Sequence, residues 1–145
     1  MVNEMHEPTV YVCDDEVSEV ARRFESCEFD CAEFNHAKHL TVLVWYLSRL
    51  PMEKAQDAMR AAILKFSRHH GKSGIYHETV TAFWVRLADG YLRGRPAETA
   101  LHTLANEVVA RFDDKDLIYR CYSRERILSL EARAAWLEPD LLLLD

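Results

Sequence analysis

The sequence predicts an all-α protein: a single compact helical bundle of about five main helices, with one or two short helices near the C-terminus. The 145 residues include only 4 glycines and 4 prolines, about half of the usual share of roughly 12% and too few for the turns of a sandwich or barrel. Hydrophobic residues make up 49% of the chain, enough for one core without disulfides. Between the glycines and prolines, apolar residues recur at helical spacing.

The spacing of apolar residues and breakers predicts each element in turn. We expect one helical domain over residues 1–145, with an irregular leader over 1–13 and main helices over about 15–27, 35–50, 52–70, 76–92 and 97–112. Pro51, Gly71 and Gly74 separate the second, third and fourth helices. Short helices are expected over about 115–122 and 131–136, the latter after Ser129 as N-cap, and residues 138–145 form a tail.

Five of the seven histidines fall between positions 36 and 77. Short links favour antiparallel neighbouring helices, so the start of the second helix, the end of the third and the start of the fourth should meet at one end of the bundle. Those three places hold, in order, His36 and His39, His69 and His70, and His77 with Glu78. The sequence therefore predicts a polar site at this end.

The residue types at this end suit a metal site. His36 and His39 are three residues apart, so both imidazoles lie on one helix face. With His77 they would supply three ligands to a divalent transition metal such as zinc, iron or nickel, leaving a position open. Glu78 is the candidate catalytic residue, as general base toward bound water or as fourth ligand. Metal-assisted hydrolysis is the reaction expected of such a site.

The same histidines also fit two alternative roles. Imidazoles at helix starts often bond loop carbonyls or carboxylates and only hold a corner of the fold together. Cys27 and Cys31 with His36 and His39 form a rival ligand set, but the two pairs stand closer together than in zinc fingers. The simpler role for these cysteines is as small apolar side chains near a turn.

Two stretches could bind an unknown small molecule or anion. Lys72 precedes the fourth helix, whose free amides can hold a negative group, and Tyr76 adds a hydroxyl there. The most basic stretch comprises Tyr119, Arg120, Tyr122, Arg124 and Arg126. In it, Tyr122 and Arg126 are candidates for a phosphate or carboxylate clamp, and pairing with the acidic surface is the alternative role for the arginines.

The formal net charge of −6 argues against general affinity for nucleic acid or an anionic membrane. The longest apolar run, residues 40–47, is far shorter than the roughly 20 residues that span a bilayer. The N-terminus lacks a signal-peptide pattern, so we expect a cytoplasmic protein with its 4 cysteines as free thiols. The apolar tail over 141–145 could pack on a partner or on a second copy in a homodimer.

Three segments form a recognisable pattern: FNHAKHLTVLVWYL (34–47), YHETVTAFW (76–84) and YSRERILSLEARAAWLEPD (122–140). They contain a His-x-x-His-Leu helix, a Tyr-His-Glu-Thr helix start and a Tyr-Ser segment that ends in Glu-Pro-Asp. In this pattern the chain, from about Phe24 onward, resembles a family of small bacterial all-helical proteins to which no activity is assigned. The resemblance implies no substrate; the residues that match its motif are His36, His39, His77, Glu78, Thr79, Tyr122, Ser123 and Arg126.

The sequence thus favours a cytoplasmic helical protein that binds a divalent metal or a small anionic ligand through a His/Glu site at one end of its bundle. The alternative, from a different class, is a non-catalytic interaction or regulatory module whose His and Tyr residues are structural.

Overall fold

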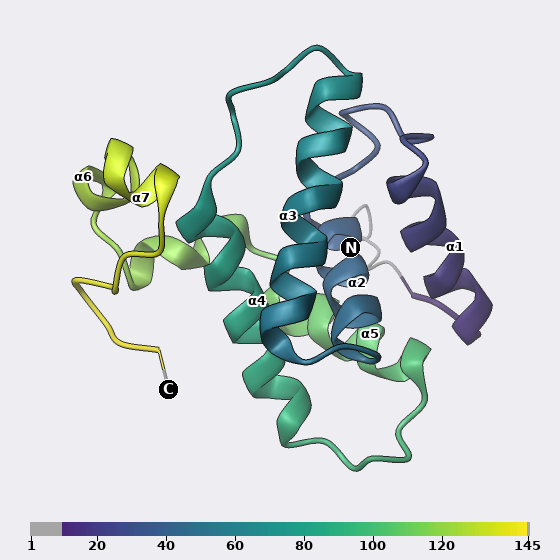
Figure 1. Cartoon of the computed structure of the whole chain (residues 1–145). Helices are drawn as coiled ribbons and strands as arrows, with labels where there is room; N and C mark the ends of the chain where they lie inside the picture. The colour runs from purple at the N-terminus through teal and green to yellow at the C-terminus, as the bar shows by residue number, and fades with distance from the viewer. Residues whose placement is uncertain (1–9, 145) are drawn as a thin grey trace, which may run out of the picture.

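The computed structural model describes residues 10–144, and every regular element in this range is helical. The main helices are α1 (Asp14–Glu25), α2 (His36–Leu47), α3 (Met52–His69), α4 (Glu78–Arg93) and α5 (Leu101–Phe112) (Figure 1). The predicted all-α class is confirmed. Most of the expected leader, and Asp145 of the tail, lie outside the described residues. No helix within 10–144 is both long and apolar enough to cross a membrane.

Helix α2 is the centre of the bundle. Its buried residues point in all directions around the helix axis: Ala37, Leu40, Thr41, Val42, Leu43, Val44 and Tyr46. Helices α1, α3, α4 and α5 all contact α2, which explains why it is apolar on every side. The sequence predicts only one apolar stripe here; in the structure seven of the twelve residues are buried, on all sides of the helix, and the other five are partly exposed.

The link between α3 and α4 reverses the chain direction, as expected. The predicted meeting of the start of α4 with the end of α3 is wrong, because Glu78 lies beside Gln56 and Arg60 in the first half of α3, away from His69 and His70. In Figure 1, α3 runs upward and α4 runs downward after the loop at the top of the view. The amides of Gly71 and Lys72 donate to the carbonyls of Arg68 and Ser67 at 3.1 and 2.7 Å, which closes α3 with a Schellman motif. Gly71 has φ 69°, a left-handed conformation that glycine adopts without a steric penalty.

The chain after α5 forms a second layer against α4. It contains the short helix η1 (Lys115–Arg120), α6 (Arg124–Ile127), α7 (Leu130–Ala134) and an extended end. Figure 1 shows α6 and α7 on the side of the molecule opposite α1, and α7 contacts α4. We call residues 121–144 the C-terminal segment.

Several boundaries differ from the expected ones by a few residues, and one helix is additional. Helix α4 begins at Glu78 rather than residue 76, because the extended backbone of His77 makes it the N-cap. Helix α5 begins at Leu101 rather than residue 97, because a turn closed from the Thr99 amide to the Pro96 carbonyl precedes it. Helix α6 is additional to the elements that the sequence predicts. Ser123 caps it, as Ser129 caps α7.

Candidate functional site

His36 and His39 lie near each other at the start of α2. Their ring centroids are 6.1 Å apart. His36 Nδ1 lies 3.1 Å from Asp113 Oδ1, so it donates to this carboxylate, and its ring stands edge-on to Trp84 with centroids 4.5 Å apart. The buried Nε2 of His36 has no hydrogen-bond partner among residues 10–144. Burial lowers the pKa of His36 despite the neighbouring Asp113.

His39 is held among aromatic side chains. Its ring stands edge-on to Phe34, with centroids 6.2 Å apart. Burial, with a smaller contribution from the nearby His36, lowers the pKa of His39 to about 3. The imidazole is therefore neutral at physiological pH.

His77 uses both of its ring nitrogens inside the fold. Nδ1 accepts a hydrogen bond from the Val80 amide at 3.2 Å, which caps α4. Nε2 lies 2.6 Å from the Ile127 carbonyl oxygen, which can only accept, so Nε2 carries the proton and donates. With neither nitrogen free, His77 does not join His36 and His39 as a ligand. Among residues 10–144 there is no group of three or more His, Cys, Asp or Glu side chains that could hold a metal ion.

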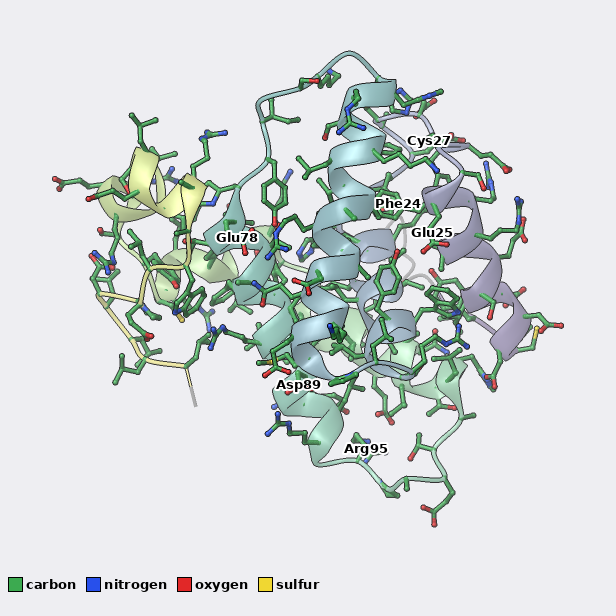
Figure 2. All side chains as sticks on the ribbon, viewed as in Figure 1. Phe24, Glu25, Cys27, Glu78, Asp89 and Arg95 are labelled. Atoms are coloured by element: carbon green, nitrogen blue, oxygen red, sulfur yellow. The ribbon has the colours of Figure 1, made fainter. Side chains whose placement is uncertain are left out.

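Glu78 also has a different environment from the expected one. Its carboxylate accepts four hydrogen bonds: from Tyr76 at 2.7 Å, from Arg60 at 2.9 and 2.8 Å, and from Gln56 at 3.0 Å. Figure 2 shows Glu78 at the start of α4, beside α3. The Arg60 guanidinium, and then Tyr76 and Gln56, lower the pKa of Glu78 to about 2. A carboxylate this acidic and this fully bonded is a poor general base; it joins α3 to α4.

Thr79 and Tyr122 belong to the sequence segments 76–84 and 122–140, on which the family resemblance rests. Both residues fasten the C-terminal segment to the bundle. The buried Thr79 hydroxyl donates to the Ala135 carbonyl at 2.7 Å and accepts from the Leu137 amide at 3.1 Å. The Tyr122 hydroxyl, also buried, donates to the Leu137 carbonyl at 2.5 Å. The Thr79 bonds join α4 to the residues beyond α7. The Tyr122 bond lies within the C-terminal segment, and Tyr122 contacts α4 through its ring, which stands edge-on to Phe83.

The remaining motif contacts lie within the C-terminal segment itself. The amide and hydroxyl of Ser123 donate to the Asp140 carboxylate at 2.8 and 2.7 Å. Arg126 Nε donates to the Glu138 carbonyl at 2.6 Å. The predicted anion-binding residues are thus dispersed: Tyr122 is buried, Tyr76 bonds Glu78, Arg126 bonds the chain end, and Lys72 is exposed in the loop before α4.

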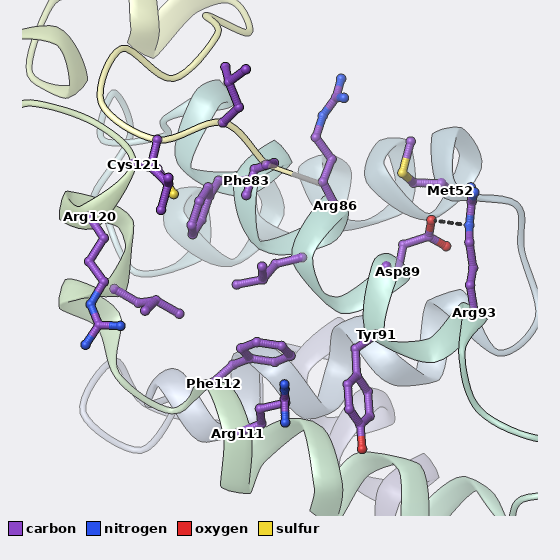
Figure 3. A pocket seen from close by; sticks show the side chains of 16 residues that line it. Met52, Phe83, Arg86, Asp89, Tyr91, Arg93, Arg111, Phe112, Arg120 and Cys121 are labelled. Atoms are coloured by element: carbon purple, nitrogen blue, oxygen red, sulfur yellow. Dashed lines mark ion pairs between the residues drawn. The ribbon is translucent and has the colours of Figure 1, made fainter.

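A pocket of about 840 Å³ lies elsewhere, between α4, the end of α5, η1 and the chain end. Phe83, Leu87, Phe112 and Leu117 give it an apolar lining, and four arginines border it: Arg86, Arg93, Arg111 and Arg120 (Figure 3). Asp89 is the one acidic side chain in the lining, and it pairs with Arg93 at 2.9 Å. The pocket is therefore positively charged on a chain whose net charge is −6.

Three of these arginines have no carboxylate partner in the described part of the chain. Arg111 and Arg120 are exposed and make no ion pair with any residue from 10 to 144. The Arg86 guanidinium lies over the Trp136 ring, 4.1 Å from its centroid, and its buried Nε has no partner within the same residues. Of these three, only Arg120 belongs to the basic stretch that the sequence indicates; no local pattern points to Arg86 or Arg111.

The rival cysteine set does not assemble either. Cys31 is exposed and Cys27 partly so. Cys27 turns the chain after α1 with φ 59°. Neither thiol belongs to a metal-binding group within residues 10–144.

Comparison with family models, curated proteins and solved structures found no match for this chain. The suspected family relationship therefore stays a prediction, and the geometry of the described residues is the basis for any function.

Proposed function

We propose that this helical domain binds a small organic anion in the pocket between α4, α5, η1 and the chain end. The observation that carries the proposal is the lining of this pocket, where Arg86, Arg111 and Arg120 stand without carboxylate partners from residues 10–144 around an apolar floor. The volume of about 840 Å³ is in the range of small-molecule sites.

Arginine is suited to this task because its planar guanidinium donates paired hydrogen bonds to a carboxylate, sulfonate or phosphate. In an acidic protein, an arginine without a carboxylate partner leaves donors that an anion can satisfy. The lining residues come from four helices, α3, α4, α5 and η1, and from the chain end, so the ligand would contact side chains that the fold already holds in place.

We propose binding rather than catalysis because the expected catalytic groups are engaged elsewhere. Glu78 holds α3 against α4, and both nitrogens of His77 are bonded within the fold. The metal set of His36, His39 and His77 is not part of this proposal, since His77 has no lone pair left for an ion. These bonds favour the alternative interpretation of the sequence, in which the His and Tyr residues are structural. The anion pocket is our addition to that interpretation.

The proposal predicts that Arg111→Gln and Arg120→Gln each weaken binding of the fluorescent anion anilinonaphthalene sulfonate by about tenfold, because each removes a charge-assisted hydrogen bond. Binding is measured by the rise in fluorescence on titration. Arg68→Gln is the matched control: it makes the same charge change at an exposed position near the end of α3 that does not line the pocket.

Equal affinity in the wild type and all three variants would overturn the proposal. A uniform decrease in all three would also contradict it, because net charge alone would then explain the binding.

A further inference from the structure

We infer that the anion bound in this pocket carries a linear aliphatic chain, as a free alkyl carboxylate does, and that this chain lies along Leu142 and Leu143. The inference rests on the proposed function, because it concerns the ligand class of the same site. Three features of the pocket carry it: its leucine wall, the hydrogen bonds that hold the start of that wall, and the shortage of acceptors in the lining.

The chain end gives the pocket an apolar wall that faces solvent. Leu142 and Leu143 line the pocket and are 59% and 70% exposed, whereas Leu144 packs against the core. Aliphatic side chains this exposed, next to an apolar floor, gain the most from covering by another aliphatic group. The guanidinium groups nearby would hold the charged end of the same molecule.

Hydrogen bonds hold the start of this wall. The Leu141 and Leu142 amides donate to the Cys121 carbonyl at 2.9 and 3.4 Å. Just before them, Asp140 is held by the amide and hydroxyl of Ser123. Leu142 is therefore exposed on an anchored backbone, directly before Leu143.

The polar lining favours an aliphatic ligand over one rich in hydroxyl groups. The Asp89 carboxylate is paired with Arg93, and the Tyr91 hydroxyl donates to Glu107 at 3.0 Å. The other polar side chains of the lining are guanidinium groups and the Cys121 thiol, which offer donors and scarcely any acceptor. Among the lining side chains a sugar would find only Asp89 and Tyr91 as acceptors for its many hydroxyl hydrogens, whereas an alkyl chain has none to satisfy.

Straight-chain alkanoates from butanoate to dodecanoate, kept below their micelle concentrations, test the inference by displacing anilinonaphthalene sulfonate from the whole protein. Affinity is expected to rise about two- to fourfold for each added methylene until the pocket is filled. Leu143→Asn is expected to weaken decanoate binding about fivefold and to leave butanoate binding unchanged. Leu141→Asn is the matched control, because Leu141 is 60% exposed on the same segment and does not line the pocket.

The possible outcomes separate the two proposals. Affinity that does not depend on chain length, or equal losses in Leu143→Asn and Leu141→Asn, would overturn the aliphatic chain and leave the anion pocket standing. Octanol that displaces the probe as well as octanoate does would overturn the anion pocket itself. Cosedimentation with phosphatidylglycerol vesicles, without displacement by decanoate, would mean that the surface recognises a bilayer and would contradict the inference.

Discussion

Replacing Tyr122 with alanine is expected to lower the free energy of unfolding by about 3–5 kcal/mol, as for other large aromatic residues in a core. Tyr122 is fully buried, and its ring stands edge-on to Phe83 and Trp136 with centroids 6.1 and 6.3 Å apart. The substitution leaves a cavity between α4 and the C-terminal segment and removes the hydrogen bond to Leu137. Urea unfolding followed by circular dichroism measures the loss.

Two further variants separate the contribution of the Tyr122 hydroxyl from that of its ring and compare Tyr122 with a less buried tyrosine. Tyr122→Phe keeps the ring and leaves the Leu137 carbonyl unbonded, so a loss of about 1 kcal/mol is expected. Tyr119→Ala, at a partly exposed position in η1, should cost clearly less than Tyr122→Ala. If Tyr122→Ala cost less than about 1 kcal/mol, the C-terminal segment would not be fastened through this residue.

Replacing Glu78 with glutamine is expected to lower stability by about 2 kcal/mol near pH 7. The side chain of Glu78 is 13% exposed and that of Arg60 is 35% exposed, so solvent screens part of the interaction that lowers the Glu78 pKa to about 2. Glutamine keeps the shape and some of the hydrogen bonds but loses the charge that faces Arg60.

The same pKa fixes the pH range of the effect. Since the folded-state pKa of Glu78 is about 2 and the ordinary value is 4.5, its contribution is complete above about pH 4.5 and is lost as the pH falls toward 2. The difference between wild type and Glu78→Gln should therefore shrink over this range when unfolding is measured by urea titration. Glu98→Gln, at an exposed position, is the control and should differ little from wild type. A difference that stayed constant with pH would contradict the ion-pair role.

The fold could be predicted to a large extent because its signals are local. Apolar spacing locates five main helices, and Pro51, Gly71 and Ser129 mark boundaries that the structure keeps. The predicted start of α4 is wrong by two residues because its cap is a histidine, which is not among the usual N-cap residues. Helix α6 has only four residues, too short for any periodicity to be detected.

The environments of His77 and Thr79 could not be predicted because their partners are distant in sequence. His77 bonds Ile127 and Thr79 bonds Ala135, more than 45 residues further along the chain in both pairs. Spacing within one helix says nothing about such contacts. Residues typical of a metal centre are used here to join α4 to the C-terminal segment.

The arginine pocket could not be predicted because the local spacing is misleading. It suggests that two of the pocket arginines are paired with carboxylates on their own helices. Glu107 is four residues before Arg111, and Asp116 is four residues before Arg120, spacings that favour ion pairs on a regular α-helix. Glu107 instead pairs with Arg95 at 2.9 Å. Asp116 and Arg120 lie in η1, a 3₁₀ helix, in which residues four apart do not share a face.

Mapping backbone amide shifts in isotope-labelled protein during titration with octanoate tests most directly whether this pocket is the ligand site. We expect the perturbed amides to lie at Met52 and within 83–93, 111–121 and 142–144, the parts of the chain that line the pocket. Amides around His36, His39 and His77 should stay unchanged. Shifts centred on those histidines, with none near Arg111 and Arg120, would contradict the assignment of the pocket as the ligand site. They would place the ligand at the starts of α2 and α4 instead.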